Sequence, residues 1–136
     1  MRGVGGIGAG WGIAVVRIMT GLVFAVHGYQ KFAGGIGHVA AFFGGIGVPL
    51  PGLAAPFISG LELVGGILLI LGLATRWVGL LFGGQMLVTT LAVQIPSRGW
   101  DASDLDRMLL AAAVLLILAG PGTAALDEAV GLESKA

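Results

Sequence analysis

The stretch SGLELVGGILLILGL, residues 59–73, is a run of apolar and small residues that contains a single carboxylate, Glu62. A segment of this length and hydropathy predicts a helix that crosses a membrane. A carboxylate within hydrocarbon is costly unless it is paired, protonated or hydrated. The stretch therefore predicts a transmembrane helix and, elsewhere in the chain, a polar partner for Glu62.

The composition of the whole chain places it among integral membrane proteins. Its 136 residues are 57% hydrophobic and only 10% charged, and its mean hydropathy is +1.01. Seven basic residues balance seven acidic ones, so the chain lacks a basic field for nucleic acid, and we exclude nucleic-acid binding. The chain has no cysteine, which excludes thiol redox chemistry and iron–sulfur or zinc–thiolate sites on this chain alone. Any electron transfer therefore needs a cofactor or a partner.

Four segments approach the roughly 20 residues that a hydrocarbon core of about 30 Å requires. They cover residues 11–32, 54–73, 77–95 and 104–120. Pro96 is expected to end the third helix, Ser103 or Asp104 can cap the fourth, and GPG at 120–122 stops it. The sequence predicts an all-α fold, in which residues 1–136 form a single membrane domain that is an integral membrane bundle of four transmembrane helices.

The connection at 33–53 contains a further apolar piece, IGHVAAFFGGIGV, which is too short to span a membrane. We expect a short interfacial or re-entrant segment here, between the first and second transmembrane helices. A structured loop is the alternative.

An even number of spans places both termini on the same side of the membrane, but the charges that could orient the chain are balanced. Three basic residues fall on each side. These are Arg2, Arg76 and Lys135 on the side of the termini, against Lys31, Arg98 and Arg107 on the other. A snorkelling Arg17 tips the count toward cytoplasmic termini.

Helix positions convert to depths at about 1.5 Å per residue, and on this scale the polar residues form two layers. The layer on the side away from the termini is a candidate buried polar cluster. Its members are His27, Lys31, Glu62, Asp104, Asp106 and Arg107. The thinner, secondary polar layer contains Arg17, Gln85 and Arg76, and Asp127 is a further candidate member.

Two interpretations of the buried cluster remain open. Glu62, paired with His27, Lys31 or Arg107, fixes the register of the helices, or the cluster binds a ligand or transfers protons. We interpret Arg17 as a snorkelling anchor, Lys31 and Arg76 as topological charges, and Gln85 as an interhelical hydrogen-bonding group.

No residue is assigned a catalytic role, and no metal site is predicted. A bis-histidine haem needs two histidines at matching depth on facing helices, and only His27 lies within a predicted span, because His38 is in the connection. Haem is therefore disfavoured, and we expect this chain alone to bind no cofactor, with a quinone as the alternative.

Three stretches together resemble the DoxX family of small four-helix bacterial membrane proteins. They are RIMTGLVFAVHGYQKF at 17–32, GLELVGGILLILGLATR at 60–76 and DLDRMLLAAAVLLILAGPGTAALDE at 104–128. The resemblance implies a multi-pass protein of the bacterial plasma membrane, in a family related to small subunits of quinol oxidase and of thiosulfate:quinone oxidoreductase. The positions that match the family pattern are Arg17, His27, Lys31, Glu62 and Arg76.

The leading functional hypothesis is an accessory or anchor subunit of a larger redox or respiratory complex, rather than an enzyme by itself. The alternative is a quinone-interacting oxidoreductase subunit, in which His27 and Glu62 form a polar site beneath residues 33–53. A small transporter or proton path is the third hypothesis. The expected partners are the lipid bilayer and a larger membrane protein complex, and glycine-rich faces also suit a homo-oligomer.

Overall fold

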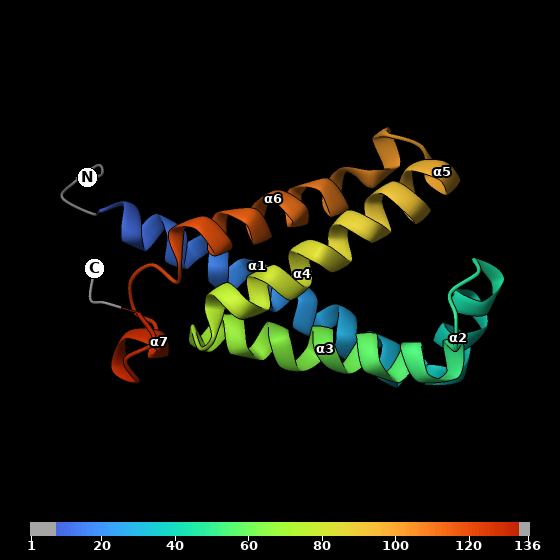
Figure 1. Ribbon diagram of the computed structural model, residues 1–136, viewed down its shortest axis with the longest axis horizontal. Coiled ribbons are helices and arrows are strands. Elements are labelled where there is room, and N and C mark those ends of the chain that lie inside the picture. The colour runs from blue at the N-terminus through green and yellow to red at the C-terminus, as the bar shows by residue number, and fades with distance from the viewer. Residues whose placement is uncertain (1–7, 134–136) are drawn as a thin grey trace.

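The computed structural model describes residues 8–133, and every regular element in that range is a helix. The long helices are α1 (Ala9–Ala33), α3 (Pro51–Leu71), α4 (Thr75–Thr89) and α6 (Asp104–Ala119). The short helices are α2 (Ile36–Gly45), the π-helical η2 (Thr90–Gln94), α5 (Ile95–Arg98), the 3₁₀ turn η3 (Asp101–Ser103) and α7 (Leu126–Ala129). The chain is thus an all-helical membrane bundle, as its sequence predicts (Figure 1). Arg2 and Lys135, which the charge count used, lie outside the described residues.

Among the described residues, three helical segments are long and apolar enough to cross a membrane: α1, α3 and the continuous run Thr75–Arg98. The predicted fourth span corresponds to α6, which has 16 residues and begins with three charged side chains. At about 1.5 Å per residue such a helix is roughly 24 Å long, shorter than a typical hydrocarbon core. Membrane crossing by α6 therefore stays a prediction.

The long helices pack as two pairs, α1 with α3 and α4 with α6. Glycines allow the first pair to approach closely. A Cβ atom on Gly21 would lie 2.5 Å from the Gly66 carbonyl oxygen, and one on Gly28 would lie 2.5 Å from the Leu63 nitrogen. Neither position can carry a side chain without a shift of the backbone. Small residues thus bring α1 and α3 together, as is common in membrane bundles.

A stacked aromatic pair joins the two helix pairs near the middle of the molecule. The rings of Phe24 in α1 and Phe82 in α4 lie 3.8 Å apart at an interplanar angle of 11°. Gly65 in α3 leaves room for this stack, because a Cβ atom there would lie 2.7 Å from the Phe82 ring. Leu69 and Leu116 complete a fully buried core around it. All four long helices therefore contribute residues to one buried core.

We expected the third long segment to end at Pro96. In the structure it continues past this residue. The chain widens into the π-helix η2 and then continues through Pro96 to Arg98. A proline has no N–H and its ring clashes with the preceding turn of an α-helix, and a π-helical turn accommodates both effects. Ser103 occupies the N-cap position of α6, but its hydroxyl donates to the Trp100 carbonyl at 2.8 Å instead of capping the helix.

The connection between α1 and α3 contains a short helix, α2, as one of the two sequence interpretations expected. None of its residues is buried, and it packs against α3 at the end of the molecule farthest from α7 (Figure 1). Gly35 and Gly47 flank it with φ angles of 100° and 85°, a region that favours glycine. The start of α1 and α7 lie together at the opposite end.

The close approach of α1 and α3 predicts that Gly66→Leu destabilises the fold by about 1–3 kcal/mol or prevents folding, because a side chain there meets the α1 backbone. The measurement is thermal unfolding in detergent, followed by circular dichroism. Gly60→Leu is the matched control, since a Cβ atom at Gly60 would meet nothing within 4 Å. Equal melting temperatures for the two variants would contradict the tight-packing account.

Candidate functional site

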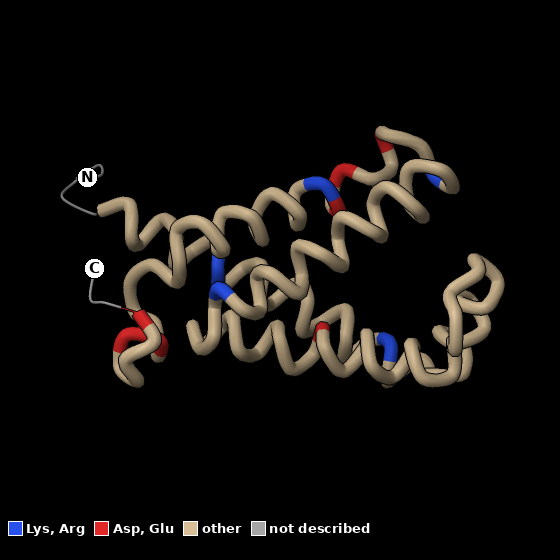
Figure 2. Tube along the Cα trace, viewed as in Figure 1, with Lys and Arg blue, Asp and Glu red and all other residues tan. Residues whose placement is uncertain are grey.

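The charged residues fall into two zones at opposite ends of the bundle. In Figure 2 one zone lies near α7 and the start of α4, and the other follows the diverging helices toward α2 and α5. The terminal zone contains Arg17, Arg76 and Asp127, and the distal zone contains Lys31 and Glu62. Charged side chains in the terminal zone bind mainly backbone groups, whereas Glu62 in the distal zone binds other side chains. This difference distinguishes the side chains that stabilise the fold from those of the candidate site.

Arg17 is fully buried, and its guanidinium donates hydrogen bonds only to backbone carbonyls. Its Nε binds the Leu69 carbonyl at 2.9 Å, near the end of α3. Its two terminal nitrogens bind the chain after α6, and they contact the carbonyls of Pro121, Thr123 and Ala124. The prediction of a snorkelling anchor is therefore wrong, because the side chain turns inward to backbone carbonyls near the end of α3 and after α6.

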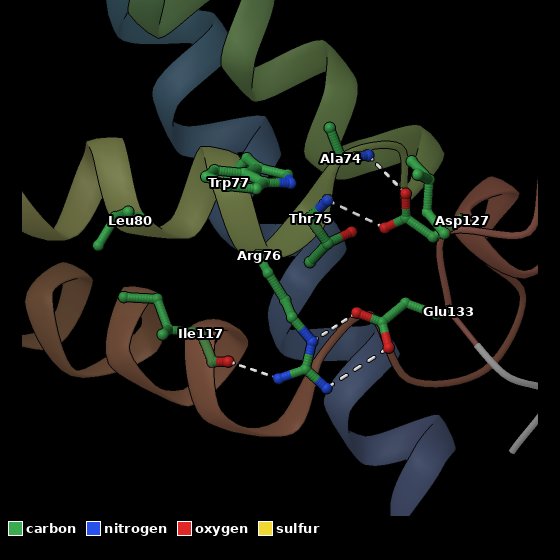
Figure 3. A pocket seen from close by; sticks show the side chains of 9 residues that line it. Ala74, Thr75, Arg76, Trp77, Leu80, Ile117, Asp127 and Glu133 are labelled. Atoms are coloured by element: carbon green, nitrogen blue, oxygen red, sulfur yellow. Dashed lines mark hydrogen bonds and ion pairs between the residues drawn. The ribbon is translucent and has the colours of Figure 1, made fainter.

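Asp127, at the start of α7, caps α4 from a distant part of the sequence. Its two carboxylate oxygens accept hydrogen bonds from the backbone N–H groups of Ala74, at 2.5 Å, and Thr75, at 2.9 Å (Figure 3). The Asp127 N–H in turn donates to the Gly72 carbonyl at 2.9 Å. A carboxylate at this position satisfies free N–H groups and complements the helix dipole.

Arg76 performs a similar role for α6. Its guanidinium donates to the Ile117 carbonyl at 2.7 Å and to the Leu118 carbonyl at 3.2 Å, and it forms an ion pair with Glu133. Figure 3 shows this contact beside the Asp127 cap, around a small cavity of about 290 Å³. Arg17, Arg76 and Asp127 thus fasten helix ends to one another.

In the distal zone, a polar triad links three helices. Glu62 of α3 is 4% exposed, and each of its carboxylate oxygens accepts one hydrogen bond. Lys31 of α1 donates to Oε2 at 2.6 Å, and Gln85 of α4 donates to Oε1 at 2.6 Å. The ammonium supplies the opposite charge that a buried carboxylate requires. Of the three basic partners considered for Glu62, the structure selects Lys31.

The placement of Gln85 corrects the predicted division into layers. Depth counting assigned Gln85 to the level of Arg17, but its amide binds Glu62 in the distal zone. The predicted helix begins at residue 54, whereas α3 begins at Pro51, so Glu62 lies deeper than counted. Glu62 is nine residues before the end of α3 and Gln85 is ten residues after the start of α4, which places them at the same level. The predicted role of Gln85 as an interhelical hydrogen-bonding group agrees with the contact that it makes.

The triad borders a large cleft of about 1090 Å³ between the diverging helix pairs. Residues from α1, α2, α3, α4, η2, α5 and α6 contribute to its walls. The walls are mainly apolar, with Phe42, Phe43, Phe57 and Leu109 among the lining side chains. The cleft is thus an apolar space with a few convergent polar groups, which is the usual form of a small-molecule site.

The other predicted members of the cluster divide between the cleft and the start of α6. His27 and Asp106 line the cleft, together with Arg98 and Gln94, which the sequence reasoning did not select for the site. One signal could have indicated these two residues. Both lie within two residues of Pro96, and a proline inside an apolar helix marks irregular backbone.

Asp104 and Arg107 do not line the cleft. They pair with each other within the first turn of α6, and the Arg107 guanidinium lies 3.5 Å above the Trp100 ring. This arrangement accounts for both side chains through local contacts.

The fold and the cleft define a helical-bundle membrane protein with an interhelical cleft that a polar triad borders. The chain matches the DoxX family over residues 12–95, and it belongs to that family. The matched region contains both the Lys31–Glu62–Gln85 triad and Arg17.

Two relatives extend the match over nearly the whole chain. The Bacillus subtilis (strain 168) protein named "Putative oxidoreductase CatD" is 39% identical over 119 residues, which cover 88% of this chain and 87% of that protein. The Escherichia coli (strain K12) "Inner membrane protein YphA" is 29% identical over 127 residues, covering 85% of this chain and 88% of that protein. No solved structure matches the chain.

The contacts of Arg17 predict that Arg17→Lys destabilises the protein by about 3 kcal/mol, because a lysine cannot replace the guanidinium fork and leaves several buried carbonyls unpaired. The measurement is the melting temperature in detergent, combined with the rate of proteolysis after α6. Arg98→Lys, at an exposed position, is the matched control. Unchanged stability and protease resistance in Arg17→Lys would refute the fastening role.

Proposed function

We propose that this protein is a membrane subunit of a bacterial redox complex, and that its interhelical cleft binds a lipid-soluble carrier of the quinone class. The observation that carries the proposal is the cleft itself, about 1090 Å³ in volume, with apolar walls and the Lys31–Glu62–Gln85 triad at its border. A quinone needs an apolar slot with hydrogen-bonding groups near its oxygens, and the cleft offers both.

The size of the cleft suits a ring with part of an isoprenoid tail. Small-molecule sites usually occupy about 300–1,000 Å³, and this space slightly exceeds that range. His27 and Asp106 line the same cleft and are titratable, so they are the candidate groups for proton exchange with a bound carrier. Lys31 supplies a cation at the border of the cleft.

A subunit role follows from the chemistry that the chain lacks. The sequence has no cysteine, so an electron that reaches the carrier must come from a cofactor or a partner protein. The relative named as an oxidoreductase supports redox work, and the inner-membrane relative supports a location in the bacterial plasma membrane. Together these observations favour a component of a larger assembly over an enzyme that acts alone.

The cleft assignment predicts that His27→Leu raises the apparent KM of the native complex for a short-chain quinol roughly tenfold, or abolishes turnover, because the cleft loses a polar group. Steady-state kinetics on membranes checks this, with the amount of assembled complex determined in parallel. Tyr29→Leu is the matched control on the same helix, since Tyr29 is 64% exposed and does not line the cleft. Wild-type kinetics in His27→Leu would exclude His27 from the site.

The subunit role predicts that gentle detergent extraction from native membranes recovers this chain together with a larger protein that carries haem or flavin. An absorption spectrum and identification of the co-migrating chains provide the measurement. Extraction in a harsher detergent, which separates the partner, is the control for specific association. A colourless protein that migrates alone under the gentle conditions would count against the subunit role.

A further inference from the structure

We infer that Glu62 orients the Gln85 amide so that the cleft prefers the hydroxyl-bearing, reduced form of a ring carrier over its carbonyl form. The inference rests on the proposed function, because it concerns the ligand of the same cleft. Gln85 is the specificity-determining residue, and Glu62 is the positioning residue that acts through it.

The orientation of the Gln85 amide follows from the chemistry of its neighbour. A carboxylate only accepts hydrogen bonds, and an amide can donate only through its nitrogen. Glu62 accepts from Lys31 at one oxygen and from the Gln85 Nε2 at the other, both at 2.6 Å. The reversed amide would place its oxygen against a carboxylate oxygen, and the two would repel each other. Glu62 therefore holds the NH₂ group of Gln85 toward itself.

This orientation leaves an acceptor without a partner. The Gln85 Oε1 atom is buried and makes no hydrogen bond to any described residue. A buried acceptor in this condition is unfavourable, and only a hydrogen-bond donor can satisfy it. Because Gln85 lines the cleft, a ligand in the cleft is in a position to supply that donor after a small adjustment of the side chain.

The neighbouring Lys31 does not discriminate in the same way. Its ammonium has three N–H donors, and Glu62 accepts only one of its hydrogen bonds. Either a carbonyl or a hydroxyl oxygen can accept another of these N–H groups. A hydroxyl can also donate to Gln85 Oε1, whereas a carbonyl cannot. The reduced form thus gains one hydrogen bond over the oxidised form, a difference that corresponds to about tenfold in affinity.

The test measures binding of three matched probes to the purified full chain in detergent by isothermal titration, with empty micelles as the blank. The probes are a short-chain alkyl hydroquinone, the corresponding benzoquinone and the dimethyl ether of the hydroquinone. The ether retains both oxygens but has no donor and is redox-inert. We expect the hydroquinone to bind about tenfold more tightly than either of the other two.

Variants assign the preference to particular atoms. Gln85→Leu removes the acceptor and should reduce the tenfold ratio to about one, while the benzoquinone still binds. Glu62→Gln should also lower the ratio, because an amide at position 62 can donate to Gln85 Oε1 and satisfy it. Gln94→Leu, which changes an amide on the cleft wall outside the triad, should preserve the ratio. Circular dichroism melts confirm that each variant is folded.

The possible outcomes separate the two proposals. Binding of none of the three probes to the wild-type chain overturns the proposed function, and the inference falls with it. Equal affinity for the three probes, or tighter binding of the benzoquinone, overturns the inference alone. A tenfold ratio that persists in Gln85→Leu also overturns it, because the preference then arises from another group.

Discussion

Hydrocarbon offers no hydrogen bonds, so a charged group inside this bundle is costly unless another group of the chain pairs with it. Arg17, Glu62 and Asp127 are each almost fully buried, and each meets this constraint in the described structure. Arg17 and Asp127 bind backbone groups at helix ends, whereas Glu62 binds only side chains. Backbone partners move only when the main chain moves. Side-chain partners can rearrange, and for that reason the triad is the better candidate for contact with a ligand.

The cleft originates in the way the helices pack. Glycines hold α1 tightly against α3, and α4 packs mainly against α6, so the bundle consists of two pairs. The pairs are joined by the Phe24–Phe82 stack and by the Glu62–Gln85 hydrogen bond. Glu62 is the last residue of α3 that lines the cleft when α3 is followed from its N-terminus. The triad therefore lies where the two pairs begin to separate.

The sequence predicted this arrangement in part. Composition and hydrophobic run lengths identified a membrane bundle, and the pairing of Glu62 with a base at similar depth included Lys31, its actual partner. Depth counting works for this pair because α1 and α3 are closely packed. It failed for Gln85, because α3 begins at Pro51, before its predicted start, so Glu62 lies deeper than counted and reaches the level of Gln85. It could not identify the partners of Arg17, because backbone carbonyls are present at every residue and leave no signature in a sequence.

Two features in the walls of the cleft share a physical character, because both have few stabilising contacts. The π-helix before Pro96 replaces regular α-helical hydrogen bonding on one wall, and α2 on another wall buries none of its residues. Irregular backbone and sparse burial lower the local free energy of opening relative to a close-packed core. The opposite end is fastened by Arg17, Arg76 and Asp127. This contrast between a fastened end and an irregular end suits the proposed binding of an apolar carrier, because the wall of the cleft could adjust while the opposite end holds the fold.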